Sequence, residues 1–119
     1  MRQARVKAYR RGLFAETVAA LLLRLRGHRI VAQRYKTPVG EIDLVALKGR
    51  RLTFIEVKRR KTADDAAWTL PAKQRRRIFR AAQYWLAGHP DFAGHDIAFD
   101  VVLAAPWAWP RYIENAFSV

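Results

Sequence analysis

The spacing of apolar residues divides the chain into two helical stretches and several extended ones. Apolar side chains return every three or four residues between positions 13 and 25, which predicts a first helix that ends at Gly27. Residues 1–11 form a basic lead-in before it. A second helix is predicted from Pro71 to Ala87, opened by the proline and closed near Gly88. The buried stripe of this second helix is expected on Ile78, Ala82 and Trp85.

Extended stretches lie between the two helices and after the second. Strands are expected at residues 28–35, 41–48, 51–59 and 97–103, the last of them almost continuously apolar and therefore central. Residues 107–117 supply a final edge strand that Pro110 weakens. Gly49 and Arg50 join the second and third strands, and glycine in the first loop position suits a type II′ hairpin turn. The order α-β-β-β-α-β(β) predicts one α/β domain over residues 1–119, with a central mixed sheet flanked by helices.

The charge balance favours a polyanionic partner. The chain has 23 Lys and Arg against 10 Asp and Glu, a net charge of +13, with the cations clustered. Such a field favours nucleic acid, whereas charge that only maintains solubility, or that attracts an anionic membrane, is the alternative. There is no cysteine for a disulfide or a thiolate metal site, and no apolar run that would span a membrane. We therefore expect a cytoplasmic protein.

Three carboxylates interrupt the apolar pattern of the predicted hairpin. With Gly49 and Arg50 as the turn, Asp43 faces Glu56 and Glu41 faces Lys58 on one side of the sheet. Facing like charges destabilise a sheet, and a divalent cation would compensate them. Mg²⁺ and Mn²⁺ prefer oxygen ligands, here two carboxylates and a strand carbonyl. The alternative is an exposed face on which Glu41 pairs with Lys58 and the other two carboxylates are solvated.

Basic residues follow the carboxylates in the sequence. Beside a metal, Lys58 would hold or polarise the attacking water and offset charge on the phosphate. A positive run leaves the third strand, and further cations crowd the first turns of the second helix, where they are unfavourable unless an anion binds. The other interpretation is that these basic side chains only point to solvent and bind no anion. The predicted nucleic-acid-binding residues are Arg59, Arg60, Lys61, Lys73, Arg75, Arg76 and Arg77.

Other candidate residues are weaker on sequence alone. Glu16 lies among small alanines that would let another element approach, although a carboxylate in the first turn of a helix is also favourable by itself. The histidines lack metal-ligand spacing. Stacking on unpaired bases or a dimer contact is one interpretation of several aromatic residues, and packing within the domain is the preferred one. These aromatic residues are Trp107, Trp109, Tyr112 and Phe117. Trp68, in the loop before the second helix, is a candidate for a substrate contact, and packing is again the preferred interpretation.

Several short motifs together resemble the YraN family of small bacterial proteins. They are Gly12 and Glu16 in the first helix, GEIDLV at 40–45, FIEVK at 54–58, KQ at 73–74 and FDVV at 99–102. That family is similar to the restriction-endonuclease-like PD-(D/E)XK nuclease superfamily and to archaeal Holliday-junction resolvases. The resemblance covers nearly the whole chain, and it implies a restriction-endonuclease-like fold with a metal site near the hairpin.

The resemblance also implies roles for individual residues. Asp43 and Glu56 would be metal ligands, Lys58 the catalytic lysine, Glu16 a further acidic residue and Gln74 a residue that reaches the site. Glu41, a possible member of the site, replaces the proline of the superfamily motif. Ala98 stands where arginine is expected, so for the nearby Asp100 we expect a structural or hydrogen-bonding role.

The sequence thus predicts an endonuclease, dependent on Mg²⁺ or Mn²⁺, that hydrolyses DNA, with Asp43, Glu56 and the Val57 carbonyl as ligands. Branched or single-stranded DNA in repair or recombination is the expected substrate, and a homodimer would suit a junction resolvase. The competing hypothesis is a non-catalytic nucleic-acid-binding module of the same fold, within a DNA-processing or RNA-associated complex, with RNA the less favoured ligand.

Overall fold

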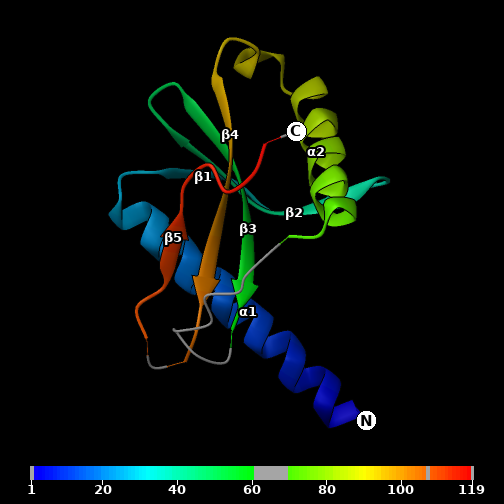
Figure 1. The fold of residues 1–119 in the computed structure, drawn as a ribbon, viewed down its shortest axis with the longest axis vertical. Coiled ribbons are helices and arrows are strands. Elements are labelled where there is room, and N and C mark those ends of the chain that lie inside the picture. Colours follow the sequence, from blue (N-terminus) through cyan, green and yellow to red (C-terminus); the bar gives the residue numbers. More distant parts are fainter. Residues whose placement is uncertain (1, 61–69, 107, 119) are drawn as a thin grey trace.

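A computed structural model describes residues 2–60, 70–106 and 108–118, with side chains from Leu13 onward (Figure 1). The elements follow the order α-β-β-β-α-β-β, which confirms the predicted fold class. They are α1 (Arg2–Leu25), β1 (Arg29–Thr37), β2 (Gly40–Lys48), β3 (Arg51–Arg59), α2 (Ala72–Ala87), a 3₁₀ turn η1 (Pro90–Phe92), β4 (Asp96–Ala104) and β5 (Arg111–Ile113).

The five strands form one mixed sheet in the order β1-β2-β3-β4-β5. β3 and β4 run parallel, and every other neighbouring pair is antiparallel. α1 lies on one face of the sheet and α2 on the other (Figure 1). Side chains alternate between these faces along β3: Phe54 packs with Trp85 of α2, and Ile55 packs with Leu23 of α1. The strand expected to be central, β4, is interior, between the middle strand β3 and the short edge strand β5.

The first helix is longer than the apolar spacing predicts. It begins at Arg2, whereas residues 1–11 were expected to precede it. Arg, Lys, Gln and Ala are good helix formers, and no glycine or proline occurs before Gly12 to stop them. Apolar periodicity marks where a helix contacts the core, so it misses a basic extension. At the other end, Gly27 adopts φ +91° and the His28 N–H donates to the Leu23 carbonyl, which ends the helix as predicted.

The hairpin between β2 and β3 has the predicted turn. Lys48 pairs with Arg51, so the loop is Gly49-Arg50. Gly49 has φ +59° while Arg50 keeps a negative φ, the pattern of a type II′ turn. α2 has Pro71 at its N-cap and Gly88 at its C-cap, as predicted. Neither described helix is long and apolar enough to cross a membrane.

Candidate functional site

β2 and β3 separate partway along the hairpin and form a fork. Their pairing runs from Lys48–Arg51 to Leu44–Ile55 and ends there. Beyond that point β2 stays paired with β1 as far as Gly40, while β3 follows β4 to Arg59. Asp43 is the first residue of β2 past the last pair. Its Oδ2 accepts a hydrogen bond of 2.8 Å from the Val57 N–H, where a regular ladder would present the Ile42 carbonyl.

β2 and its outer neighbour β1 are both irregular at the level of Asp43. In a regular strand residues two apart face the same way, but Leu44 packs against α1 whereas Ile42 packs in the α2 core. On β1, Arg34 lies opposite Asp43, between the paired residues Gln33 and Tyr35, and has φ +51°. A left-handed conformation costs an arginine ~1–2 kcal/mol. Because of this irregular backbone, the Asp43 side chain does not follow the regular alternation of β2, and it reaches across the fork to the Val57 N–H.

Asp43 and Glu56 form a largely buried carboxyl pair in the fork. Burial raises the pKa of Asp43, although the Val57 N–H bond opposes the shift. Burial, followed by the charge of Asp43, raises the pKa of Glu56 to about 7. Two neighbours reach the same oxygen, Oε1 of Glu56: the Gln74 Nε2 donates to it at 3.1 Å, and the Lys58 Nζ lies 3.5 Å away. Near neutral pH the pair therefore exchanges a proton with solvent.

Glu16 brings a third carboxylate from α1 to the fork. The Arg34 Nε lies 3.0 Å from Oε2 of Glu16. Burial, and next the charge of Asp43, raises the pKa of Glu16, so the two carboxylates are neighbours. The bend at Arg34 thus places a guanidinium on Glu16. The sequence pattern did not indicate Arg34, since nothing near it is typical of a left-handed turn.

The predicted pairing of Glu41 with Lys58 is wrong. Glu41 is exposed and pairs in the ladder with Lys36 of β1, because β2 has already left β3 at this point. Glu41 still raises the pKa of Asp43 and of Glu16 through its charge. It therefore lies at the rim of the fork.

The residues of the fork suit a hard cation. Among the described residues no three His, Cys, Asp or Glu side chains are grouped closely enough to hold a metal ion by themselves. Asp43 and Glu56 supply two carboxyls whose pKa values are raised by burial first and by neighbouring carboxylates after it. The Val57 N–H points toward β2, and the carbonyl of a strand residue points to the same side as its N–H, so it too faces the fork. Two carboxyls, this carbonyl and water would satisfy Mg²⁺ or Mn²⁺.

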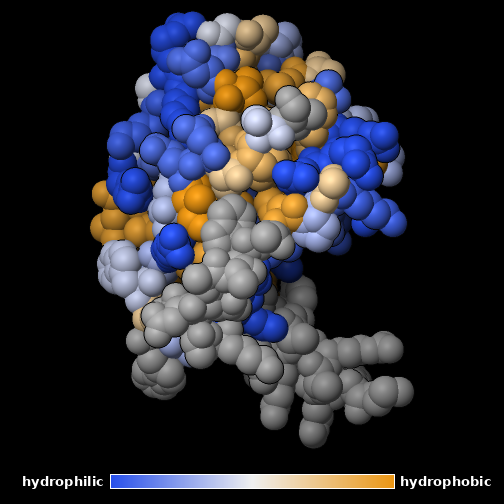
Figure 2. Space-filling model, in the orientation of Figure 1, coloured by the Kyte–Doolittle hydropathy of each residue, from blue (hydrophilic) through white to orange (hydrophobic). Residues whose placement is uncertain are grey.

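Cations surround the fork on two elements. Gln74 turns inward to Glu56 from the first turns of α2, which have no acidic residue and no side-chain cap. Figure 2 shows hydrophilic residues gathered over this part of α2. Arg59 is exposed at the end of β3, and Arg60 follows it; the predicted Lys61 and Trp68 lie outside the described residues. The exposed cations in the first turns of α2 are Lys73, Arg75, Arg76 and Arg77.

Close packing brings α2 over the start of β2. A side chain on Gly40 would place its Cβ 2.8 Å from the Arg77 carbonyl oxygen, too close for any residue but glycine. The absence of a side chain at this position lets α2 approach β2. This approach carries Gln74 to Glu56 and the basic turns of α2 to the mouth of the fork.

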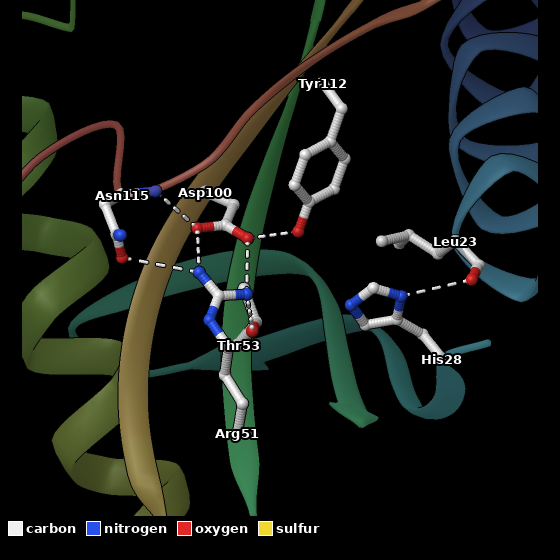
Figure 3. A network of polar contacts seen from close by, with 7 residues as sticks. All are labelled: Leu23, His28, Arg51, Thr53, Asp100, Tyr112 and Asn115. Atoms are coloured by element: carbon white, nitrogen blue, oxygen red, sulfur yellow. Dashed lines mark hydrogen bonds and ion pairs between the residues drawn. The ribbon is translucent and has the colours of Figure 1, made fainter. Parts of the chain in front are cut away.

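Asp100 belongs to a separate structural network (Figure 3). Its carboxylate is fully buried and accepts two 2.9 Å bonds from Arg51, one of 2.8 Å from the Asn115 N–H, and one from the Tyr112 hydroxyl. Bonding to Asp100 raises the pKa of Arg51; burial and then the same carboxylate raise that of Tyr112. The network joins β3, β4 and β5, which is a structural, hydrogen-bonding role of the kind expected for Asp100.

The fold and the forked sheet define a small α/β protein with an acidic pair beneath a basic surface. The model of the uncharacterised protein family UPF0102 matches residues 15–104, and the chain belongs to that family, which confirms the YraN-family resemblance. A UPF0102 protein of Parvibaculum lavamentivorans is 54% identical over 110 residues, 92% of this chain and 83% of the relative. UPF0102 proteins of Bradyrhizobium sp. and Rhodopseudomonas palustris are each 50% identical over 113 residues, 95% of this chain and 80% and 84% of theirs.

Proposed function

We propose that this protein is a metal-dependent nuclease that hydrolyses phosphodiester bonds of DNA. The observation that carries the proposal is the carboxyl pair of Asp43 and Glu56, buried in the fork with Lys58 and Gln74 on one of its oxygens. Two adjacent buried carboxyls destabilise a fold, and perturbed groups of this kind are typical of functional sites. A cation and a phosphate would compensate both the pair and the basic residues around it.

Each group in the fork has a role in this proposal. Asp43, Glu56 and the Val57 carbonyl would hold Mg²⁺ or Mn²⁺, which when bound supplies Lewis-acid activation of water and phosphate. Lys58 would position the attacking water and offset charge that develops on the phosphate oxygens. Gln74 fixes the orientation of the Glu56 carboxyl. Glu16, oriented by Arg34, would hold water at the edge of the site.

The basic surface supports DNA as the substrate. Exposed cations lie near the fork on two elements: Arg59 follows Lys58 at the end of β3, and the first turns of α2 reach Glu56 through Gln74. A helix N-terminus with arginines and without acidic residues is a favourable place for phosphate. A strand held between these two surfaces would pass its backbone over the carboxyl pair.

A cleavage assay tests the proposal. Labelled branched, single-stranded and duplex DNA is incubated with Mg²⁺, Mn²⁺ or EDTA and with wild type, Glu56→Ala or Lys58→Ala, all purified identically. We expect metal-dependent cutting that falls at least ~100-fold in both variants, since charge stabilisation of this kind is worth a few kcal/mol. Asp91→Ala, at an exposed carboxylate in η1, is the matched control. Equal cutting by wild type and Glu56→Ala would remove the assignment.

A non-catalytic nucleic-acid-binding module is the second candidate. The spacing of the acidic residues favours this candidate. Among the described residues, no three His, Cys, Asp or Glu side chains are close enough together to hold a metal ion by themselves. A non-catalytic module predicts binding that weakens steeply with salt and is indifferent to divalent metal. Calorimetry that shows Mn²⁺ binding lost in Asp43→Asn would exclude it. Competition between DNA and RNA separates the ligands, and sedimentation with and without a four-way junction tests a homodimer.

A further inference from the structure

An apolar pocket lies close to the fork but apart from it. Its volume is about 650 Å³, and it is bounded by α1, by the ends of β3 and β4, and by the segment before β5. Two of its aromatic side chains are unusually exposed, Phe14 at 69% and Trp109 at 75%. Val18, Pro106 and Pro110 line it as well, and among the described residues of its lining Arg59 is the one charged side chain. We call this site the Trp109 pocket.

The position of the Trp109 pocket relates it to the fork. Arg59 directly follows Lys58 on β3, and at ~3.3 Å per residue it lies ~10 Å from Glu56. Neighbouring residues of a strand face opposite sides of the sheet, so Lys58 faces the carboxyl pair while Arg59 faces the pocket. α1 contributes both Glu16 of the fork and Phe14 of the pocket. A flexible strand that crosses the end of β3 would meet both sites.

Charge selects the occupant of the Trp109 pocket. A second copy of this chain would bring another +13 against a surface that already includes Arg59. A nucleotide instead offers a flat apolar base for the indole and phenyl rings and a phosphate for the guanidinium. Proteins that hold single strands combine aromatic platforms with cations in this way. A base enters such a pocket only when it is unpaired.

We propose that the Trp109 pocket binds an unpaired nucleobase next to the phosphate held in the fork, so that the substrate is single-stranded or frayed DNA. The choice of substrate rests on the proposed nuclease function, whereas base binding itself does not. Trp109 supplies the stacking surface, and Arg59 binds the phosphate between the pocket and Lys58. Duplex DNA lacks the unpaired base and gains only backbone contacts.

Binding in EDTA tests base recognition without cleavage. Fluorescence anisotropy measures the affinity of a labelled oligothymidine and of a duplex hairpin for wild type, Trp109→Ala and Trp109→Phe. Stacking is worth ~1–3 kcal/mol per base, so Trp109→Ala should lose ~5- to 150-fold in affinity for the single strand and less than ~2-fold for the duplex. Trp109→Phe should retain most of the affinity. Tyr84→Ala removes an exposed aromatic residue of α2 and should change neither.

An abasic scan identifies the contact. Oligonucleotides with one abasic nucleotide at successive positions should show one position at which wild type loses ~5-fold or more and Trp109→Ala loses nothing further. Equal losses for single strand and duplex, or no loss in Trp109→Ala, would overturn the proposal. So would a wild-type dimer that Trp109→Ala dissociates with unchanged DNA affinity. If wild type cuts DNA in a metal-dependent way but its affinity does not depend on an unpaired base, the proposed nuclease function is retained and the proposed base binding is refuted. If it binds an unpaired base but does not cut, base binding is retained and the nuclease function is refuted.

Discussion

Glu56→Gln should stabilise the protein in the absence of metal, because Glu56 is kept in an environment that disfavours its charge. Its side chain is only 13% exposed and lies beside Asp43. Glutamine retains an oxygen that accepts the bond from Gln74, and its amide can donate to Asp43 as a protonated carboxyl does. The substitution therefore removes the charge while it keeps the contacts.

The pKa of Glu56 sets the size and the pH dependence of the effect. A folded-state pKa of about 7, against an ordinary 4.5, means that the folded protein binds the proton more tightly than the unfolded chain. Stability from this group is fully present below pH 4.5 and is lost as the pH rises to 7. At ~1.4 kcal/mol per pH unit, the loss is ~3 kcal/mol. Glutamine avoids this loss, and because the pKa of about 7 already includes the opposing attraction to Lys58, the gain at pH 8 is ~3 kcal/mol.

Urea unfolding in EDTA measures this gain at pH 5 and pH 8. The free energy of unfolding of Glu56→Gln should exceed that of wild type by this amount at pH 8 and by less than ~1 kcal/mol at pH 5. In thermal unfolding the gain corresponds to ~4 °C per kcal/mol. Glu114→Gln, at an exposed carboxylate that follows β5, is the matched control and should show no such difference. A Glu56→Gln protein that is less stable at pH 8, or equally offset at both pH values, would refute the reasoning.

Three further predictions concern the metal, the buried network and the packing of α2. Mn²⁺ at 100 times its dissociation constant should raise the free energy of unfolding of wild type by ~3 kcal/mol, and that of Glu56→Gln much less, in the same urea assay. Asp100→Asn leaves the Arg51 charge uncompensated and should lower the free energy of unfolding, measured by thermal unfolding, by ~3 kcal/mol. Asp96→Asn, at an exposed position on the same strand, should not lower it. Gly40→Ala forces the Arg77 turn of α2 away from β2 and should cost ~1–3 kcal/mol of folding free energy. If the protein is the proposed nuclease, cleavage should also be slower because Gln74 moves with the helix. Gly49→Ala, where a Cβ meets open space, separates turn strain from this effect.

Local chemistry explains which parts of the fold the sequence could predict. The Gly49-Arg50 turn depends on two residues between alternating runs, and it fixes the register that brings Asp43 to Glu56. α2 has its boundaries at Pro71 and Gly88 for the same kind of reason. Long-range contacts leave no such signal. The bond from Arg51 to Asp100 joins residues 49 positions apart, and no local pattern indicates that these two will pair.

The incorrect pairing of Glu41 with Lys58 identifies what makes the fork a site. Prediction from the turn assumes that β2 and β3 stay paired, which would engage the Val57 N–H and carbonyl with Ile42 and leave the two facing carboxyls without a backbone ligand. The strands instead separate after Leu44 and Ile55, so the Val57 N–H donates to Asp43. The Val57 carbonyl points to the same side of β3 as this N–H and therefore faces the fork. The left-handed Arg34, opposite Asp43, accompanies the bend and also holds Glu16. The carboxyl pair alone is a local feature of the sequence, but its surroundings are produced by the bend, and the bend depends on β1 and α1.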